Sequence, residues 1–74
     1  MSILPILKGS MVLRKLLRAG FKILYTKGSH YVLRHPATKK ITEVPLHGSR
    51  DIDRGLLSKI IKQAGLTIKE FLKF

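Results

Sequence analysis

Residues 21–46 read FKILYTKGSHYVLRHPATKKITEVPL, and this stretch indicates the class of fold. Its β-branched and aromatic residues are typical of strands, and they fall in three segments: Phe21–Thr26, Ser29–His35 and Lys40–Leu46. Lys27-Gly28 and Pro36–Lys39 separate these segments and have turn-forming compositions. Because strands joined by such short connections pair antiparallel, the sequence predicts a three-stranded antiparallel meander.

A helix is predicted before the meander. Apolar residues from Val12 to Leu17 recur at the spacing of one helix face, with basic residues on the other side. Ser10 is the candidate N-cap, and Gly20 ends the helix. The preceding MSILPILKG, residues 1–9, allows three interpretations: it pairs as an edge, covers the core or stays mobile.

Two helices are predicted after the meander. Apolar residues recur at helical spacing over residues 56–64, behind a candidate N-cap at Asp51 or Asp53. Thr67 and Glu70 have the T-x-x-E spacing of a capping box, which predicts a short last helix. The order α-β-β-β-α with an extra terminal helix predicts an α+β domain like the double-stranded-RNA-binding domain, with helices on one sheet face and the other face open.

Length and composition narrow the possible classes of protein. A chain of 74 residues makes a single domain, residues 1–74, with one thin core. It has no cysteine, and the spacings of its three histidines match no short metal-binding motif, so we expect neither a metal nor a cofactor. Apolar runs fall far short of the ~20 residues of a membrane span, and no secretory leader is evident, so we expect a soluble cytoplasmic protein.

Charge is the strongest compositional feature. Fifteen Lys and Arg residues against four Asp and Glu residues leave a formal net charge of +11. Nine of the basic residues and none of the acidic ones lie in residues 1–42. Any single lysine is more simply explained as part of a solvated helix face, but the collective excess predicts a polyanionic partner.

One histidine lies at the corner between the first two predicted strands. In the second strand His30 and Arg34 point to one side, whereas Tyr31 and Leu33 point to the other and are expected in the core. His30 would therefore lie on the open face with Lys27 at the adjacent turn. On this pattern alone, a solitary exposed histidine without a role is the simpler interpretation.

Three longer stretches resemble the HicA toxins of bacterial and archaeal toxin–antitoxin modules. They occur in the family's order and approximate spacing: VLRKLLRAGF at residues 12–21, KGSHYVLRHP at 27–36 and EVPLHGSRDIDRGLLSKIIKQAGLT at 43–67. No single motif is specific, but their combination in one short chain is. The resemblance implies a ribonuclease of the mRNA interferase type with a double-stranded-RNA-binding-like fold.

The resemblance also implies a catalytic residue and a partner. The family's catalytic histidine follows a glycine–serine or glycine–glycine corner, which corresponds to His30 here. Its implied partner is a HicB antitoxin that blocks the active surface. Tyr31 stands where many relatives carry a second histidine, and strand alternation directs this side chain to the core.

Such a histidine can support RNA cleavage without a metal. The ribose 2′-hydroxyl loses a proton as it attacks the adjacent phosphate, and a neutral imidazole can accept that proton. Lys27 and Lys22 are expected to bind RNA phosphate, while Arg34, about 13 Å along the strand from His30, is expected to bind a flanking phosphate. Gly28 can take a positive φ at the turn, which is the simpler reason for a glycine here, and it also keeps the corner thin enough for an RNA backbone.

Other roles near the corner stay open at this point. Ser29 can cap the turn or donate a hydrogen bond to phosphate, and His35, before Pro36, is expected to support a turn. Water, His47, Tyr31 or a lysine can protonate the leaving 5′-oxygen. Two other functions fit the composition: a non-catalytic RNA-binding module and a membrane-active cationic protein.

Overall fold

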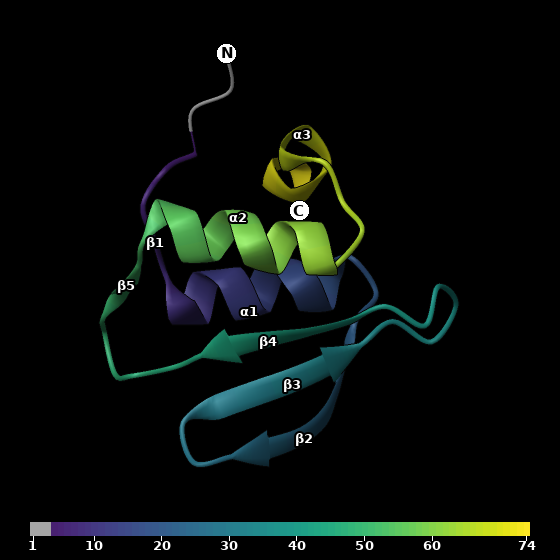
Figure 1. Ribbon diagram of the computed structural model, residues 1–74, viewed down its shortest axis with the longest axis horizontal. Helices are drawn as coiled ribbons and strands as arrows, with labels where there is room; N and C mark the ends of the chain where they lie inside the picture. The colour runs from purple at the N-terminus through teal and green to yellow at the C-terminus, as the bar shows by residue number, and fades with distance from the viewer. Residues whose placement is uncertain (1–3) are drawn as a thin grey trace.

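The computed structural model describes residues 4–74, and it contains the predicted meander as a three-stranded antiparallel sheet (Figure 1). Each strand agrees with its predicted segment to within one or two residues. The strands are hydrogen-bonded in the order β2-β3-β4, with bounds β2 Lys22–Lys27, β3 His30–Arg34 and β4 Ile41–Pro45. The predicted strand composition and turns were therefore sufficient to locate the sheet.

Three helices accompany the sheet, in the predicted α-β-β-β-α order with an additional short C-terminal helix. Their bounds are α1 Gly9–Arg18, α2 Arg54–Gln63 and α3 Ile68–Lys73. Helices α1 and α2 both contact β4, and α3 contacts both of these helices. Figure 1 shows β2 at the edge of the sheet that lies farthest from the helices.

A second, two-stranded sheet was not predicted from the sequence. Strand β1, Leu7–Lys8, pairs antiparallel with β5, Asp51–Ile52. Leu4, before β1, is buried in the core. The described part of the N-terminal segment thus pairs as an edge and also covers the core, while residues 1–3 lie outside the described part of the chain.

Pairing of β1 with β5 also explains why the predicted cap of the first helix is wrong. Helix α1 begins at Gly9 with Lys8 at the N-cap position, and no side chain caps it. Instead, the Gly9 N–H donates to the carbonyl oxygen of Arg50 at 3.4 Å, next to β5. A Cβ atom at Gly9 would lie 2.8 Å from the carbonyl oxygen of Pro45, so glycine allows this helix to approach the end of β4.

The caps of the other two helices follow the prediction. Asp53, rather than Asp51, is the N-cap of α2 and accepts a hydrogen bond from the Leu56 N–H at 2.8 Å. Before α3, the Thr67 hydroxyl accepts from the Glu70 N–H at 3.1 Å, and Glu70 Oε1 accepts from the Thr67 N–H at 2.8 Å. These bonds to Thr67 hold the pKa of Glu70 below its ordinary value of 4.5.

The core lies between the sheet and the helices. Its largest fully buried apolar side chains come from both strands and helices: Phe71, Leu16, Leu33, Leu57, Ile60, Val12 and Val44. Thr42 is the buried polar residue of β4, and its hydroxyl lies 3.2 Å from the carbonyl oxygen of Ile60 and 3.2 Å from Gln63 Oε1. These contacts position α2 against β4, next to the candidate site.

Side chains of β3 alternate as predicted. Leu33 is in the core and Tyr31 packs against it. His30 and Arg34 lie on the opposite side of the strand, as their spacing requires. The His30 side chain keeps 44% of its accessible surface, so it is reachable from solvent. Val32, on the same side as His30, is nevertheless buried.

Candidate active site

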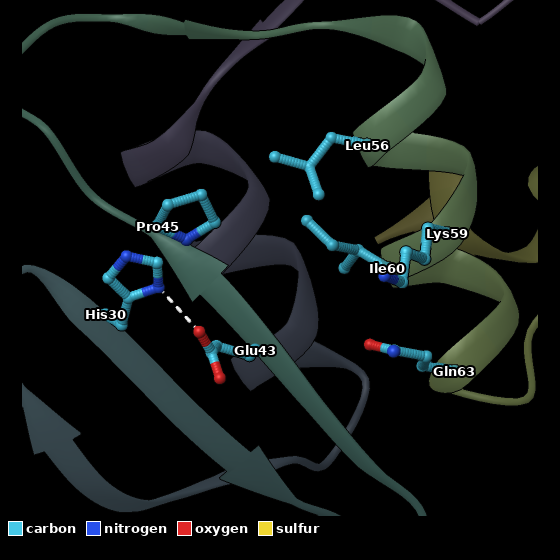
Figure 2. A pocket seen from close by; sticks show the side chains of 7 residues that line it. All are labelled: His30, Glu43, Pro45, Leu56, Lys59, Ile60 and Gln63. Atoms are coloured by element: carbon cyan, nitrogen blue, oxygen red, sulfur yellow. Dashed lines mark hydrogen bonds and ion pairs between the residues drawn. The ribbon is translucent and has the colours of Figure 1, made fainter.

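A carboxylate from the neighbouring strand contacts His30. His30 begins β3, and its Nδ1 lies 2.5 Å from Glu43 Oε2 in β4 (Figure 2). The strand register pairs His30 with Pro45 and Val32 with Glu43, so Glu43 is the diagonal neighbour of His30 on the same face. Both side chains are about half exposed, at 44% and 53%. The sheet register therefore creates a solvent-accessible histidine–carboxylate pair.

This contact determines which nitrogen of His30 is available for chemistry. An ionised carboxylate can only accept a hydrogen bond, so it favours a proton on Nδ1. Nε2 then carries the lone pair, and within residues 4–74 no hydrogen bond involves Nε2. The arrangement can therefore hold the ring in place and leave Nε2 of a half-exposed histidine free to accept a proton.

A second histidine lies beside the first. The loop after β4 carries His47, whose Nδ1 is 2.9 Å from Ser29 Oγ. The His30 and His47 ring centroids are 5.7 Å apart, with the ring planes at 83°. A backbone hydrogen bond from the Leu46 N–H to the Ser29 carbonyl oxygen, at 2.7 Å, holds this loop against the corner before β3. Ser29 and His47, far apart in sequence, thus meet beside His30.

Two adjoining hollows meet at His30. The hollow in Figure 2 has a volume of about 230 Å³ and is lined by His30, Glu43, Pro45, Leu56, Lys59, Ile60 and Gln63. The other has a volume of about 340 Å³ and is lined by His30, Pro45, His47, Arg50, Asp51, Ile52, Asp53 and Leu56. Each hollow therefore combines His30 with an apolar wall at Leu56 and a cation, Lys59 in one and Arg50 in the other.

Glu43, Lys59 and Arg50 were missed as site residues in the sequence. Glu43 could have been found, because a residue at the matching parity of the next strand shares the face of His30. Lys59 comes from α2, and its position depends on how that helix packs against β4. No local pattern distinguishes Lys59 or Arg50 from the other basic residues.

The predicted phosphate-binding cations lie outside these two hollows. Lys22 and Arg34 are directly paired across β2 and β3, and with Ile23, Leu24 and Pro36 they line a separate hollow of about 270 Å³. Lys27 is paired with His30 in the register and is exposed. The candidate cations are thus distributed along the sheet rather than gathered around His30.

The geometry of Gly28 agrees with its predicted role, whereas Ser29 makes a contact that was not predicted. Gly28 has a φ of 60°, the left-handed conformation that its turn requires, and the space where a side chain would project is open. Ser29 instead directs its hydroxyl to the His47 ring. A cap or a bond to phosphate therefore has to compete with this contact.

His35 supports the turn, as predicted. Its Nδ1 accepts from the Ala37 and Thr38 N–H groups at 3.1 and 3.3 Å, and its ring lies edge-on to Phe21 with centroids 5.2 Å apart. Across residues 4–74, no group of three or more His, Asp or Glu side chains could hold a metal ion. None of the helices described is long and apolar enough to cross a membrane.

The fold and these residues define a small basic α+β domain with a histidine–carboxylate pair on one sheet face. A family model described as "HicA toxin of bacterial toxin-antitoxin" matches residues 9–66. Since this match covers most of the chain, the protein belongs to the HicA toxin family, and it is a toxin that pairs with an antitoxin. A comparison with curated proteins finds no match.

Proposed function

We propose that the protein is a metal-independent endoribonuclease that cleaves mRNA, with His30 as its general acid/base residue. The observation that carries the proposal is the His30–Glu43 contact in a hollow of a strongly basic domain. Membership of a family of ribonuclease toxins supports the same reaction. The proposed reaction needs no metal, because the nucleophile is the 2′-hydroxyl of the RNA itself.

In this reaction His30 Nε2 accepts the proton of a ribose 2′-hydroxyl. The 2′-oxygen forms a bond to the adjacent phosphorus while the bond from phosphorus to the 5′-oxygen breaks, which leaves a 2′,3′-cyclic phosphate on one product. Glu43 stabilises the imidazolium that forms on His30 and keeps Nδ1 as a donor. The leaving 5′-oxygen takes up a proton and becomes a hydroxyl on the other product.

Cations around the pair supply the complementary charge. Lys59 and Arg50 line the two hollows at His30, and in the proposed reaction they stabilise the growing negative charge of a phosphate bound there. Lys22 and Arg34 bind flanking phosphates along the sheet, and Lys27 binds at the corner. The net charge of +11 favours association with RNA in general.

The test compares the wild type with His30→Ala in the presence of a chelator, using a labelled single-stranded RNA. We expect the variant to cleave about 10²–10⁴-fold more slowly, since one positioned acid/base group contributes about that much. Binding is measured separately on RNA whose 2′-hydroxyls are methylated, and we expect it to be nearly unchanged. His35→Gln is the matched control, because it removes a histidine that supports a turn outside the two hollows.

Each failure of this test has a distinct meaning. Equal cleavage by the wild type and His30→Ala would remove His30 from the mechanism. Binding without cleavage by the wild type would favour the non-catalytic RNA-binding module. Cleavage that stops with the chelator would show that the reaction needs a metal.

The antitoxin's mode of action belongs to the same proposal. We expect a HicB-like antitoxin to cover the hollows at His30, where it would exclude RNA. Adding the purified antitoxin to the cleavage assay should then abolish product formation and also displace the methylated RNA. Inhibition of cleavage without displacement of RNA would place the antitoxin elsewhere on the protein.

A further inference from the structure

We infer that His47 is the general acid that protonates the leaving 5′-oxygen, and that Ser29 is its positioning residue. This inference rests on the proposed ribonuclease function and names the proton donor that the reaction still needs. In the sequence His47 is one of several possible proton donors. The geometry around the K-G-S-H corner separates it from the others.

The rings of His30 and His47 lie close together. The His30 and His47 ring centroids are 5.7 Å apart, and the rings are nearly perpendicular at 83°. An acid or base must approach its oxygen to within about 2.6–3.2 Å, so two rings this close can both reach oxygens of one phosphodiester group. Each ring is held through Nδ1, and within residues 4–74 neither Nε2 atom takes part in a hydrogen bond.

The two groups that contact the Nδ1 atoms of these histidines differ in chemistry. Glu43 presents a carboxylate to His30, and a carboxylate only accepts hydrogen bonds. Ser29 presents a hydroxyl to His47, and a hydroxyl can either donate or accept. His47 can therefore donate from Nδ1 to the neutral Ser29 hydroxyl both before and after Nε2 gives up its proton.

Two other possible proton donors, Tyr31 and Lys59, lie in different places from His47. Tyr31 packs against the core on the side of β3 opposite to His30. Lys59 lines the hollow that contains Glu43, whereas His47 lines the adjoining hollow together with Arg50 and two carboxylates, Asp51 and Asp53. His30 and His47 thus share one hollow, which Lys59 does not line.

As the bond between phosphorus and the 5′-oxygen breaks, that oxygen takes a proton from His47 Nε2 and leaves as a hydroxyl. His30 holds the proton taken from the 2′-hydroxyl. Exchange with water then returns His30 to its neutral form and His47 to its protonated form, and no other reactant is consumed.

The experiment uses two RNA substrates that differ in one atom at the cleavage site. One has the ordinary 5′-oxygen, and the other has a sulfur in its place, which leaves as a thiolate without needing a proton. We expect His47→Ala to cleave the oxygen substrate about 10²–10⁴-fold more slowly and the sulfur substrate nearly as fast as the wild type. His30→Ala should lose activity on both substrates, because the 2′-hydroxyl still needs a base.

Ser29 is tested by two variants. Ser29→Ala should slow the oxygen substrate less than His47→Ala does and leave the sulfur substrate unaffected, while Ser29→Thr should restore cleavage by keeping the hydroxyl. Thermal unfolding and binding of methylated RNA confirm that each variant folds and binds. A Ser29→Ala protein that cleaves both substrates more slowly, and by the same factor, would contradict the positioning role.

The outcomes distinguish this inference from the function on which it rests. If His47→Ala slows cleavage of both substrates equally, or slows cleavage of neither, His47 is not the general acid although the ribonuclease function stands. If the wild type cleaves neither substrate, the proposed function itself is wrong and the inference falls with it.

Discussion

Glu43 is the residue through which the sheet orients His30. The two side chains come from adjacent strands, and their contact of 2.5 Å depends on the register in which Val32 faces Glu43. Because both are about half exposed, the pair contributes little to stability and its importance is chemical. In the proposed reaction Glu43 is a positioning residue, so its effect should appear in turnover.

The Glu43→Gln variant tests this role. An amide lacks the charge that stabilises the imidazolium, and it can also turn its NH₂ group toward His30 and favour the wrong tautomer. We expect kcat to fall at least about 10-fold but less than the ~10²–10⁴-fold loss from removing His30, with KM and the melting temperature little changed. An unchanged kcat would show that His30 needs no carboxylate.

Tyr31 illustrates a prediction about one residue that the structure bears out. Strand alternation directs Tyr31 to the core, and its side chain packs there, away from the hollows at His30. A second histidine at this position would occupy the same side of β3. The tyrosine is accommodated because it supplies apolar surface on the side that the core requires.

At the scale of elements, the ends of the helices show which local patterns are reliable. Asp53 and the Thr67–Glu70 pair cap their helices as predicted, because a side chain bonds to backbone three residues ahead. Ser10 does not cap α1, since the start of that helix is held by the β1–β5 pairing. A cap is predictable only where no distant segment takes over the helix end.

The capping box makes the stability of α3 dependent on pH. Bonds to Thr67 lower the folded-state pKa of Glu70 below 4.5, so its ionised form stabilises the fold above pH 4.5. This contribution is lost as the pH falls through the folded-state pKa. Glu70→Gln should therefore be less stable than the wild type near pH 7, and the two should converge in strongly acidic solution.

Chemical unfolding of both proteins from pH 7 to pH 3 measures this difference. Lys69→Ala, on the same helix, is the control, because it removes a charge without touching the capping box. A difference between the wild type and Glu70→Gln that stays constant over the whole pH range would contradict the assignment.

At the scale of the whole molecule, basic and acidic residues are distributed unevenly between the two parts of the chain. Most of the basic excess lies in residues 1–42, which include α1, β2 and β3, whereas all four carboxylates follow. The second part contributes Glu43, His47 and Lys59 to the hollows around His30. Most of the basic excess and three of the side chains around His30 therefore come from different segments of the chain, which meet where β3 pairs with β4.

RNA binding should accordingly depend strongly on salt. Each phosphate neutralised on single-stranded RNA contributes about 0.7 to the slope of log K against log salt concentration. We expect Lys22→Ala to reduce the slope by about that amount, because Lys22 pairs with Arg34 beside the hollow of about 270 Å³. Binding of methylated RNA is measured over a range of salt concentrations.

A matched charge removal gives the control for this measurement. Lys69→Ala lowers the net charge equally but lies on α3, away from the sheet. Its slope should remain that of the wild type. Equal effects of Lys22→Ala and Lys69→Ala would mean that RNA responds to total charge and makes no defined contact at Lys22.

Local patterns in the sequence were enough to place the three-stranded sheet, the three helices and His30, but not the β1–β5 pair. Strand alternation and helical spacing act over a few residues, so they predicted the meander, the helix order and the side of β3 on which His30 lies. The contacts of His30 with Glu43 and of His47 with Ser29 join residues 13 and 18 positions apart. They depend on strand register and on the path of the loop after β4, which arise only when distant segments bury their apolar surface together.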